Sequence, residues 1–554
     1  MVYCGKASQG CQNCRTRRIK CDKKRPECSQ CIRVGKKCPG YRDQLSLMFR
    51  DESSKVIQKA HAQWGSSGSP IDGSGSTAGS SSSAWAIESL SGSSDSPSSS
   101  SPSPPQDIAS ARLPKKVNLN LEQQGMQFYI NRYLMNHPDS PRTHDQVATY
   151  CAEVGTTQNV MIAVGLAGLS NLQGDKNLNM VARSQYVAAL KHTGQLIAAN
   201  DPSSLVARVR GVVALALFEV VQGKGPRSTV GSANTHINGA VAVLRSVLPL
   251  PPTATPSPAT PGGGPAPNLT KGGYAIVMLL FSMLIPYQMT DTPLPPAFFD
   301  TLKFCRFLMH SSSESCACDH VFASARLLQL SAIAEHTVFT DGRTATDDLV
   351  QQFLSLEDTF DALEGPHLKA FPFTEKQGDC PPEAVFRGKW HVYEMIWGAR
   401  IWNHYRWARI LVNQRLVKFI TEYPISSSKT ISAIRRAKCY ATIDRMAQDI
   451  LISTPSHWHH PMLSPQDTLK FESNGPGSSG AVGLPSHLWH VMIAGCAPNV
   501  PLEYWNWAHN VLLVVWKQLG MQHALALAEI MEEHRAKLDK EATKQKFKLE
   551  FEDE

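Results

Sequence analysis

Apolar and polar residues recur with the period of an α-helix over most of this chain of 554 residues. In the stretch LEQQGMQFYINRYLMNH, Met126, Tyr129 and Tyr133 lie near one stripe, at the three- and four-residue spacing of a helix face. The stretch SLVARVRGVVALALFEVVQG is almost wholly apolar after Arg210, as expected of a helix buried in a core. Strand-like alternation is nearly absent. The pattern predicts a mainly α-helical protein whose body, residues 117–545, is one large all-α domain.

A run rich in Pro, Thr and Gly, residues 249–273, interrupts this helical pattern. A helix with Ala240, Val243 and Leu244 on one face precedes it, and helical periodicity resumes after it. We therefore expect a disordered insert inside a single helical array. The most apolar run of the chain, Tyr274–Tyr287, is too short to span a bilayer and contains a proline, which favours a buried helix.

An aromatic-rich segment, KWHVYEMIWGARIWNHYRWARIL, also shows helical spacing. Its recurring residues are Trp390, Tyr393, Trp397, Ile401 and Tyr405. We predict a helix whose aromatic face packs into the core of the body. An effector pocket is the alternative interpretation of the same face.

Charge is concentrated at the amino-terminal end. The chain has a formal net charge of +8, but residues 1–50 contain thirteen Lys/Arg and three Asp/Glu, a net charge of +10, which leaves −2 for the other 504 residues. A small basic head on a nearly neutral body is the charge distribution of a nucleic-acid binder. The first ten residues lack the apolar core of a secretory signal, so we expect an intracellular chain whose thiols stay reduced.

Six of the fourteen cysteines lie in this basic head as an internal duplication, CQNCRTRRIKC followed by CSQCIRVGKKC. Clustered cysteines in a reducing compartment indicate a metal site rather than disulfides. Each half supplies three thiolates, one fewer than a closed tetrahedral zinc site needs. The deficit closes if two sulfur atoms each bridge two metals, and Cys11 and Cys28, the first cysteine of each half, are placed equivalently for this role.

A single zinc ribbon of four cysteines is the alternative interpretation. It would use Cys11, Cys14, Cys28 and Cys31 and would leave the equal six-residue gaps to the third cysteine of each half unexplained. Cys4 lies outside the repeat, and we expect it to be a bystander.

The stretch GCQNCRTRRIKCD, with Pro26 in the connecting segment and CPGY at the end, resembles the fungal binuclear zinc cluster, a DNA-binding module with two zinc ions and six cysteines. We place this module at residues 9–41. The resemblance implies two Zn²⁺ per chain. It also implies that Cys11 and Cys28 are bridging ligands. Cys14 and Cys21 would complete the first zinc site, and Cys31 and Cys38 would complete the second. The order of apolar stretches in the body resembles the helical regulatory domain that accompanies such clusters in fungi.

The two halves of the repeat differ in the residues that could reach DNA. Arg17 and Arg18 of the first half align with Val34 and Gly35 of the second, and we expect the glycine to end the second helix early. The first helix, with basic residues through Lys20, would then present the long donors. An arginine can donate two parallel hydrogen bonds to O6 and N7 of guanine, and the resemblance implies that a CGG-like triplet is read from the positions of Arg17 and Arg18. Other basic residues are expected to contact phosphates: Arg15, Lys20, Lys36 and Lys37.

Between the head and the body we predict a short helical linker at residues 42–64 and a disordered tether rich in Ser, Gly and Pro at residues 65–116. No heptad register holds for three heptads in the linker, so a homodimer stays open as an alternative to a monomer. The basic runs RTRRIK and KKR also suit nuclear import.

The body shows none of the common catalytic motifs, such as Gly-x-Ser-x-Gly, a Walker loop, a dinucleotide fingerprint or His-Glu-x2-His. Two weaker metal candidates are the histidines of SHWHHP, which are His457, His459 and His460, and the CAC cysteines, which are Cys316 and Cys318. We therefore predict no enzyme.

Taken together, these patterns predict a nuclear, zinc-dependent transcription factor of the fungal RNA polymerase II type. Its partners would be double-stranded DNA with CGG-like half-sites and the transcription machinery or its co-regulators, with no membrane. It would regulate a gene set, with a metabolic or biosynthetic cluster as the candidate. The alternatives are a zinc-stabilised protein-interaction scaffold without sequence-specific DNA binding, and an enzyme in the helical body.

Overall fold

The computed structural model describes two parts of the chain, the cysteine-rich head and the helical body. The described residues are 11–17, 19–22, 28–38, 119–134, 158–199, 205–223, 232, 235–243, 273–307, 309, 311–339, 347–423, 431–471 and 484–552. The predicted linker at 42–64 and the predicted tether at 65–116 lie outside them. Of the predicted insert at 249–273, only Gly273 is described, as the first residue of a helix.

Helices dominate the described residues, which confirms the predicted fold class. The head contains α1 (Gln12–Thr16) and α2 (Ser29–Ile32). The body contains α5 (Leu121–Tyr129), α7 (Gln158–Gln173), α8 (Lys176–Ala199), α9 (Leu205–Gln222), α11 (Gly273–Thr290), α12 (Pro296–Phe307), α13 (Ser312–Ala334), α14 (Asp347–Ala370), α15 (Ile396–Glu422), α17 (Ala433–Ser453), α18 (Pro465–Thr468), α19 (Leu484–Gly495), α20 (Leu502–Leu519) and α21 (Gln522–Glu552). Short π-helical turns extend α5 at Ile130–Leu134 and α13 at Glu335–Phe339, 3-10 turns lie at Phe386–Gly388, Thr454–Ser456 and Leu469–Phe471, and residues 235–243 are also helical.

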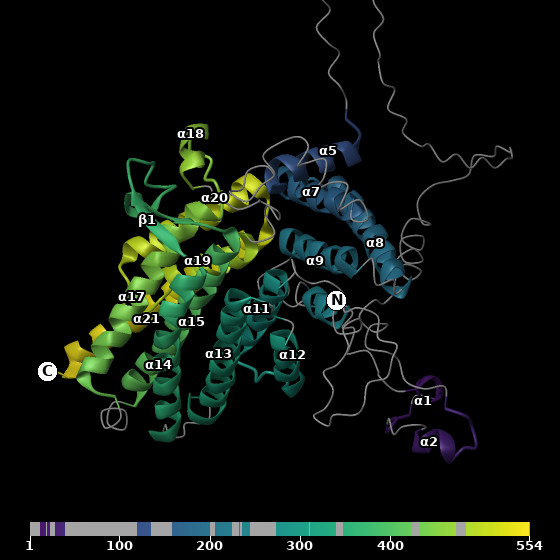
Figure 1. Cartoon of the computed structure of the whole chain (residues 1–554), viewed down its shortest axis with the longest axis horizontal. Coiled ribbons are helices and arrows are strands. Elements are labelled where there is room, and N and C mark those ends of the chain that lie inside the picture. Colours follow the sequence, from purple (N-terminus) through teal and green to yellow (C-terminus); the bar gives the residue numbers. More distant parts are fainter. Residues whose placement is uncertain are drawn as a thin grey trace, which may run out of the picture. The chain divides into compact units, whose positions relative to one another are not determined.

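Successive helices of the body pack against one another. Contacts join α11 to α13, α13 to α14, α14 to α15 and α15 to α17, and Figure 1 shows these helices side by side, coloured from teal to green. Contacts of α20 with α7 and of α21 with α9 join the two ends of the body, so that one hydrophobic core reaches from Tyr129 to Met531. No helix in the described ranges has both the length and the apolarity needed to cross a membrane, and the apolar run at 274–287 is part of α11.

The turn after α5 and helix α7 both meet the end of α20 at close range. The Tyr133 hydroxyl donates a hydrogen bond to the Leu519 carbonyl, and the Asn171 amide donates to the Gly520 carbonyl over 2.8 Å. Gly520 ends α20 with a left-handed φ of 64°. A Cβ atom at this position would lie 2.3 Å from the Gly168 carbonyl oxygen, so the close approach of α7 and the end of α20 depends on a residue without a side chain.

The aromatic-rich segment differs from its predicted form. Trp390 and Tyr393 lie on strand β2 (Lys389–Tyr393), which pairs antiparallel with β1 (Phe373–Gln377), and α15 begins only at Ile396. The helical spacing of the aromatic residues across this boundary is coincidental, because cross-strand pairing decides the conformation of such a short segment. Trp390, Tyr393, Ile401 and Tyr405 are all buried in the body, as the packing interpretation predicted, and Trp397 is half-buried.

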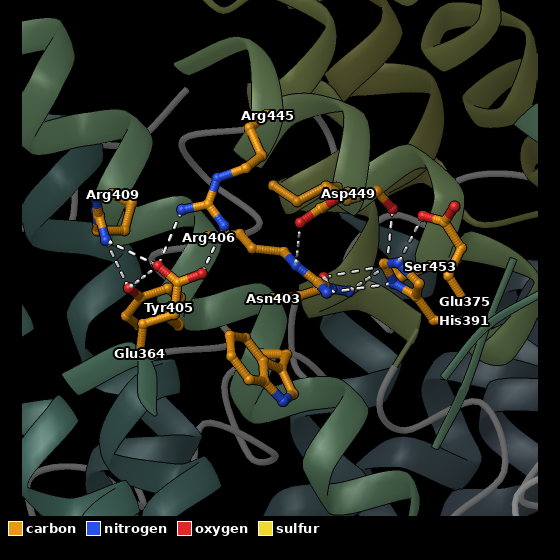
Figure 2. A network of polar contacts seen from close by, with 12 residues as sticks. Glu364, Glu375, His391, Asn403, Tyr405, Arg406, Arg409, Arg445, Asp449 and Ser453 are labelled. Carbon is orange, nitrogen blue, oxygen red and sulfur yellow. Dashed lines mark hydrogen bonds and ion pairs between the residues drawn. The ribbon is translucent and has the colours of Figure 1, made fainter. Parts of the chain in front are cut away.

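A buried ion-pair network joins α14, α15 and α17 (Figure 2). The Arg409 guanidinium on α15 lies 2.7 Å from Glu357 on α14, and both side chains are 1% exposed. Arg409 also donates to the Tyr405 hydroxyl over 2.7 Å and lies 3.4 Å from Glu364. At the outer side of the same network, Arg445 on α17 contacts Glu364 at 2.5 Å while 48% exposed.

Replacing Arg409 by Ala is expected to lower the free energy of unfolding of the body by about 3–5 kcal/mol, because Glu357 would keep a buried carboxylate without its partner. Burial already raises the pKa of Glu357. Arg445→Ala is the matched control from the same network, and its exposed pair should cost less than about 1 kcal/mol. Urea denaturation followed by circular dichroism measures both values. Equal losses in the two variants would contradict this assignment.

Candidate metal centre and nucleic-acid interface

Each half of the cysteine repeat begins a short helix immediately after its first cysteine. Cys11 precedes α1, and Cys28 is the residue before the first turn of α2, where its Sγ accepts a hydrogen bond from the backbone N–H of Cys31 over 3.3 Å. The carboxylate of Asp22 accepts from the Ser29 N–H over 3.1 Å. The first two cysteines of each half are therefore held one helical turn apart, with their sulfur atoms on the same side of the helix.

The two helices end in the same way. The N–H of Ile19 donates to the Cys14 carbonyl over 3.0 Å, and the N–H of Lys36, its counterpart in the repeat, donates to the Cys31 carbonyl over 3.1 Å. Gly35 has a left-handed φ of 66° and its N–H bonds the Ile32 carbonyl, which is the hydrogen-bond pattern of a helix that stops at glycine. Gly35 ends the second helix as predicted, but the first helix ends at nearly the same point of its half, so the predicted difference in length between the two helices is not found.

The first helix is shorter than predicted. It ends at Thr16, with Arg17 in the turn and Lys20 beyond it, rather than continuing through Lys20. The physical reason is the hydrogen bond from Ile19 to Cys14, which turns the chain back so that Cys21 rejoins the other sulfur atoms.

The six sulfur atoms form two overlapping groups of four. The groups are Cys11, Cys14, Cys21 and Cys28, and Cys11, Cys28, Cys31 and Cys38, and within each group all sulfur atoms lie within 4.8 Å of one another. The distances from Cys11 Sγ to Cys28 Sγ, from Cys11 Sγ to Cys31 Sγ and from Cys14 Sγ to Cys28 Sγ are each 3.6 Å. Cys11 and Cys28 therefore belong to both groups, and the pattern of shared sulfur atoms is that of two adjoining tetrahedra with a common edge.

These distances fit zinc and exclude disulfides. Four sulfur atoms around Zn²⁺ at about 2.3 Å would lie about 3.8 Å apart along a tetrahedral edge, whereas a disulfide requires about 2.05 Å. Cys11, Cys14, Cys28, Cys31 and Cys38 are buried, and burial raises the pKa of the first four thiols. Thiolates in such a place need cations beside them, so the donor set and its geometry suit a pair of Zn²⁺ ions.

The predicted DNA-contacting residues are only partly described. Arg17, Lys20, Lys36 and Lys37 are exposed, with their charges open to solvent. Arg18 and the side chain of Arg15 lie outside the described residues. Arg33, which the sequence interpretation did not select, is also exposed beside the end of α2.

Two further residues of the head were missed at the sequence level. Asn13 and Asp22 make hydrogen bonds from the first half of the repeat to the second. The repeat itself contained a signal for them, because Asn13 aligns with the longer amide Gln30 and Asp22 with Pro39, so the second half reproduces neither residue of the first.

Among the weaker metal candidates of the body, His457, His460 and Cys318 are buried, and His459 and Cys316 are half-buried. His457 is buried and stacks on His487 with ring centres 4.1 Å apart, and its Nε2 lies 2.9 Å from the Asn403 amide. Cys318 is buried on α13, and Cys316 Sγ lies 3.5 Å from His367 Nδ1. Within the described residues, the two cysteine groups of the head are the only sets of three or more candidate ligands close enough to hold a metal ion.

Comparison with known proteins finds similarity in the segment that contains the cysteine repeat. Residues 9–47 match the family model of the fungal Zn(2)-Cys(6) binuclear cluster domain. The chain is 51% identical over 37 residues to the aspercryptin biosynthesis cluster-specific transcription regulator atnN of Emericella nidulans. Those residues are 7% of this chain and 6% of the relative, so the similarity is confined to one short segment of each. No solved structure matches the chain.

Proposed function

We propose, on the premise that residues 9–47 are a fungal Zn(2)-Cys(6) binuclear cluster domain, that this protein is a nuclear, sequence-specific DNA-binding transcription regulator. The observation that carries the proposal is the pair of four-sulfur groups that share Cys11 and Cys28. Cys14 and Cys21 would complete one zinc site, and Cys31 and Cys38 the other, giving two Zn²⁺ per chain. The regulated gene set would be a metabolic or biosynthetic cluster.

Zinc supplies shape to this domain, not reaction chemistry. The described residues of the head form only short helices around a buried cluster of cysteines, so a segment of this size depends on metal ligation to hold its fold. The protein chain positions the side chains that would contact DNA. Helix α1 places Arg17 just past its end and exposed, and we assign base contacts with a CGG-like triplet to Arg17 and Arg18.

We assign phosphate contacts to Arg15, Lys20, Lys36 and Lys37 because all four are basic and the three lysines are exposed. Residues 1–50 have a net charge of +10. Two Zn²⁺ and six thiolates add a net −2, so the loaded head would keep about +8 toward the DNA backbone. Lysine and arginine contacts of this kind release counterions, so affinity should fall steeply with salt concentration.

Replacing Arg18 by Ala is expected to relax base preference within the triplet, with a loss of about 1–3 kcal/mol on the preferred duplex and little on others. Lys36→Ala is the matched control from the second half. It should weaken binding to all duplexes alike and reduce the salt slope by about one. Fluorescence anisotropy with the full chain, on the selected duplex and on a scrambled one, measures both effects. A uniform loss in both variants would show that Arg18 does not read a base.

The experiment that tests the proposed function itself is an unbiased selection of duplexes from a random pool by the purified full chain. A recovered CGG-like triplet supports it, and the spacing of paired triplets reports whether the protein binds as a homodimer. A pool that shows no enrichment would favour the zinc-stabilised interaction scaffold instead.

A further inference from the structure

The side chain of Asn13 links the two halves of the cysteine-rich head. Asn13 lies on α1, between the two cysteines that begin the first half. Its Nδ2 donates to the Sγ of Cys31 over 3.5 Å and to the backbone carbonyl of Lys37 over 3.1 Å. Both acceptors belong to the second half, 18 and 24 residues further along the chain.

The chemistry of the two acceptors fixes the orientation of this amide. A carbonyl oxygen and a thiolate both accept hydrogen bonds, and only the NH₂ group of asparagine can donate. One NH₂ group has two N–H bonds, so it satisfies both acceptors at once. Cys31 lies on α2, and Lys37 is the neighbour of Cys38 in the chain. A single side chain therefore contacts one terminal ligand of the second zinc site and the residue next to the other.

The first zinc site lacks the reciprocal arrangement. In the repeat, Gln30 of α2 is the counterpart of Asn13, and the corresponding acceptor would be Cys14. In the described part of the head, Cys14 has hydrogen-bond contacts with other cysteines, and no amide side chain reaches its sulfur. The duplicated sequence therefore folds into a pseudo-symmetric pair of sites with one cross-half amide bond, directed at the second site.

We propose that Asn13 is a positioning residue of the metal centre. Its amide holds the Cys31 thiolate and joins the Lys37–Cys38 segment of the second half to α1. This inference rests on the proposed function, because it assumes that Cys31 is a zinc-bound thiolate. A hydrogen bond from an amide to a thiolate draws charge from the sulfur, so it makes the ligand a weaker nucleophile, and it also holds the sulfur in the position of a zinc ligand. The residue acts through Cys31 and does not contact DNA.

The test uses the zinc-loaded full chain and two matched variants, Asn13→Ala and its repeat counterpart Gln30→Ala. Zinc content is measured first, by elemental mass spectrometry. The proteins are then treated with a small excess of N-ethylmaleimide, and the rate of modification of each cysteine is followed by peptide mapping. We expect the modification rate of Cys31 to rise about three- to tenfold in Asn13→Ala, the size of effect that one lost hydrogen bond produces. In Gln30→Ala the rates should equal those of the unmodified chain.

A second readout reports the hydrogen bond separately from packing. With Co²⁺ in place of Zn²⁺, the sulfur-to-cobalt charge-transfer bands should move to longer wavelength in Asn13→Ala, because the freed thiolate donates more strongly, and should not move in Gln30→Ala. Two zinc ions in every variant with unchanged Cys31 reactivity and unchanged bands would overturn the role of Asn13 and leave the proposed function intact. An unmodified chain that binds no zinc would instead overturn the proposed function.

Discussion

Replacing Cys11 by Ser is expected to remove both zinc ions from the chain and to lower its affinity for a selected duplex to the non-specific level, a loss of about 10³-fold or more. The reason is that Cys11 Sγ belongs to both four-sulfur groups, at 3.6 Å from Cys28 Sγ and from Cys31 Sγ. Each group would be left with three sulfur atoms, and a closed structural zinc site needs four ligands. Elemental mass spectrometry gives the zinc content, and fluorescence anisotropy gives the affinity.

Two control variants make this result specific for shared ligation. Cys38 belongs to one group only, so Cys38→Ser should retain one zinc ion per chain under the same conditions. Cys4 lies outside the repeat, and Cys4→Ser should retain two. A Cys11→Ser chain that still contains two zinc ions, or an unmodified chain that contains one, would refute the binuclear arrangement and favour a single four-cysteine site.

The helical body is expected to unfold cooperatively in acid, with a midpoint between about pH 5 and pH 6. Burial lowers the pKa of ten histidines among the described residues, His460 and His534 included. The shift is large in eight of them: the pKa falls to about 4 in His367 and His523, about 3 in His490 and about 2 in His391, and well below the usual value in His320, His404, His457 and His487. In the unfolded chain each would titrate near pH 6.5. Far-UV circular dichroism against pH measures the transition.

The direction in which stability changes with pH follows from proton uptake. Below pH 6.5 the unfolded chain binds protons that the folded body does not, so the free energy of unfolding decreases as pH falls. Each of the four histidines whose pKa is about 4 or lower contributes a loss of about 1.4 kcal/mol at pH 5.5, and the losses from the other buried histidines bring the total into the range of the 5–15 kcal/mol that stabilises a typical domain. The stability is fully present above the unfolded pKa. The neighbouring guanidinium groups of Arg400 and Arg406 disfavour charged forms of His457 further.

A single substitution provides the control for acid unfolding. His523 on α21 is buried, and its ring Nδ1 meets no hydrogen-bond partner among the described residues. Replacing it by Leu should leave the body folded at neutral pH, move the acid midpoint to lower pH and reduce proton uptake on unfolding by one. A body that keeps its helical signal down to pH 4 would show that the buried histidines do not control its acid stability.

Much of the described geometry of the head could be predicted from sequence, because it is local. Two cysteines three residues apart fall on one turn of a helix, a third returns after a fixed gap, and Gly35 ends the second helix where it was expected to. The exceptions were the length of α1 and the bridging roles of Asn13 and Asp22. The length of α1 depends on the turn that the hydrogen bond from Ile19 to Cys14 closes. The contacts of Asn13 and Asp22 depend on how one half of the repeat lies against the other, which spacing within each half does not specify.

For the body, the periodicity of apolar residues by itself determined that it is helical and which stretches are buried, such as those of α9 and α11. Only the tertiary structure decided where helix gives way to strand at Trp390 and Tyr393, because the backbone groups of β2 are paired with β1 and not with their own neighbours in sequence. Only the tertiary structure, too, placed His457 against His487 and Arg409 against Glu357. A polar residue becomes buried when segments that are distant in the chain pack around it, so the local sequence pattern does not predict its burial.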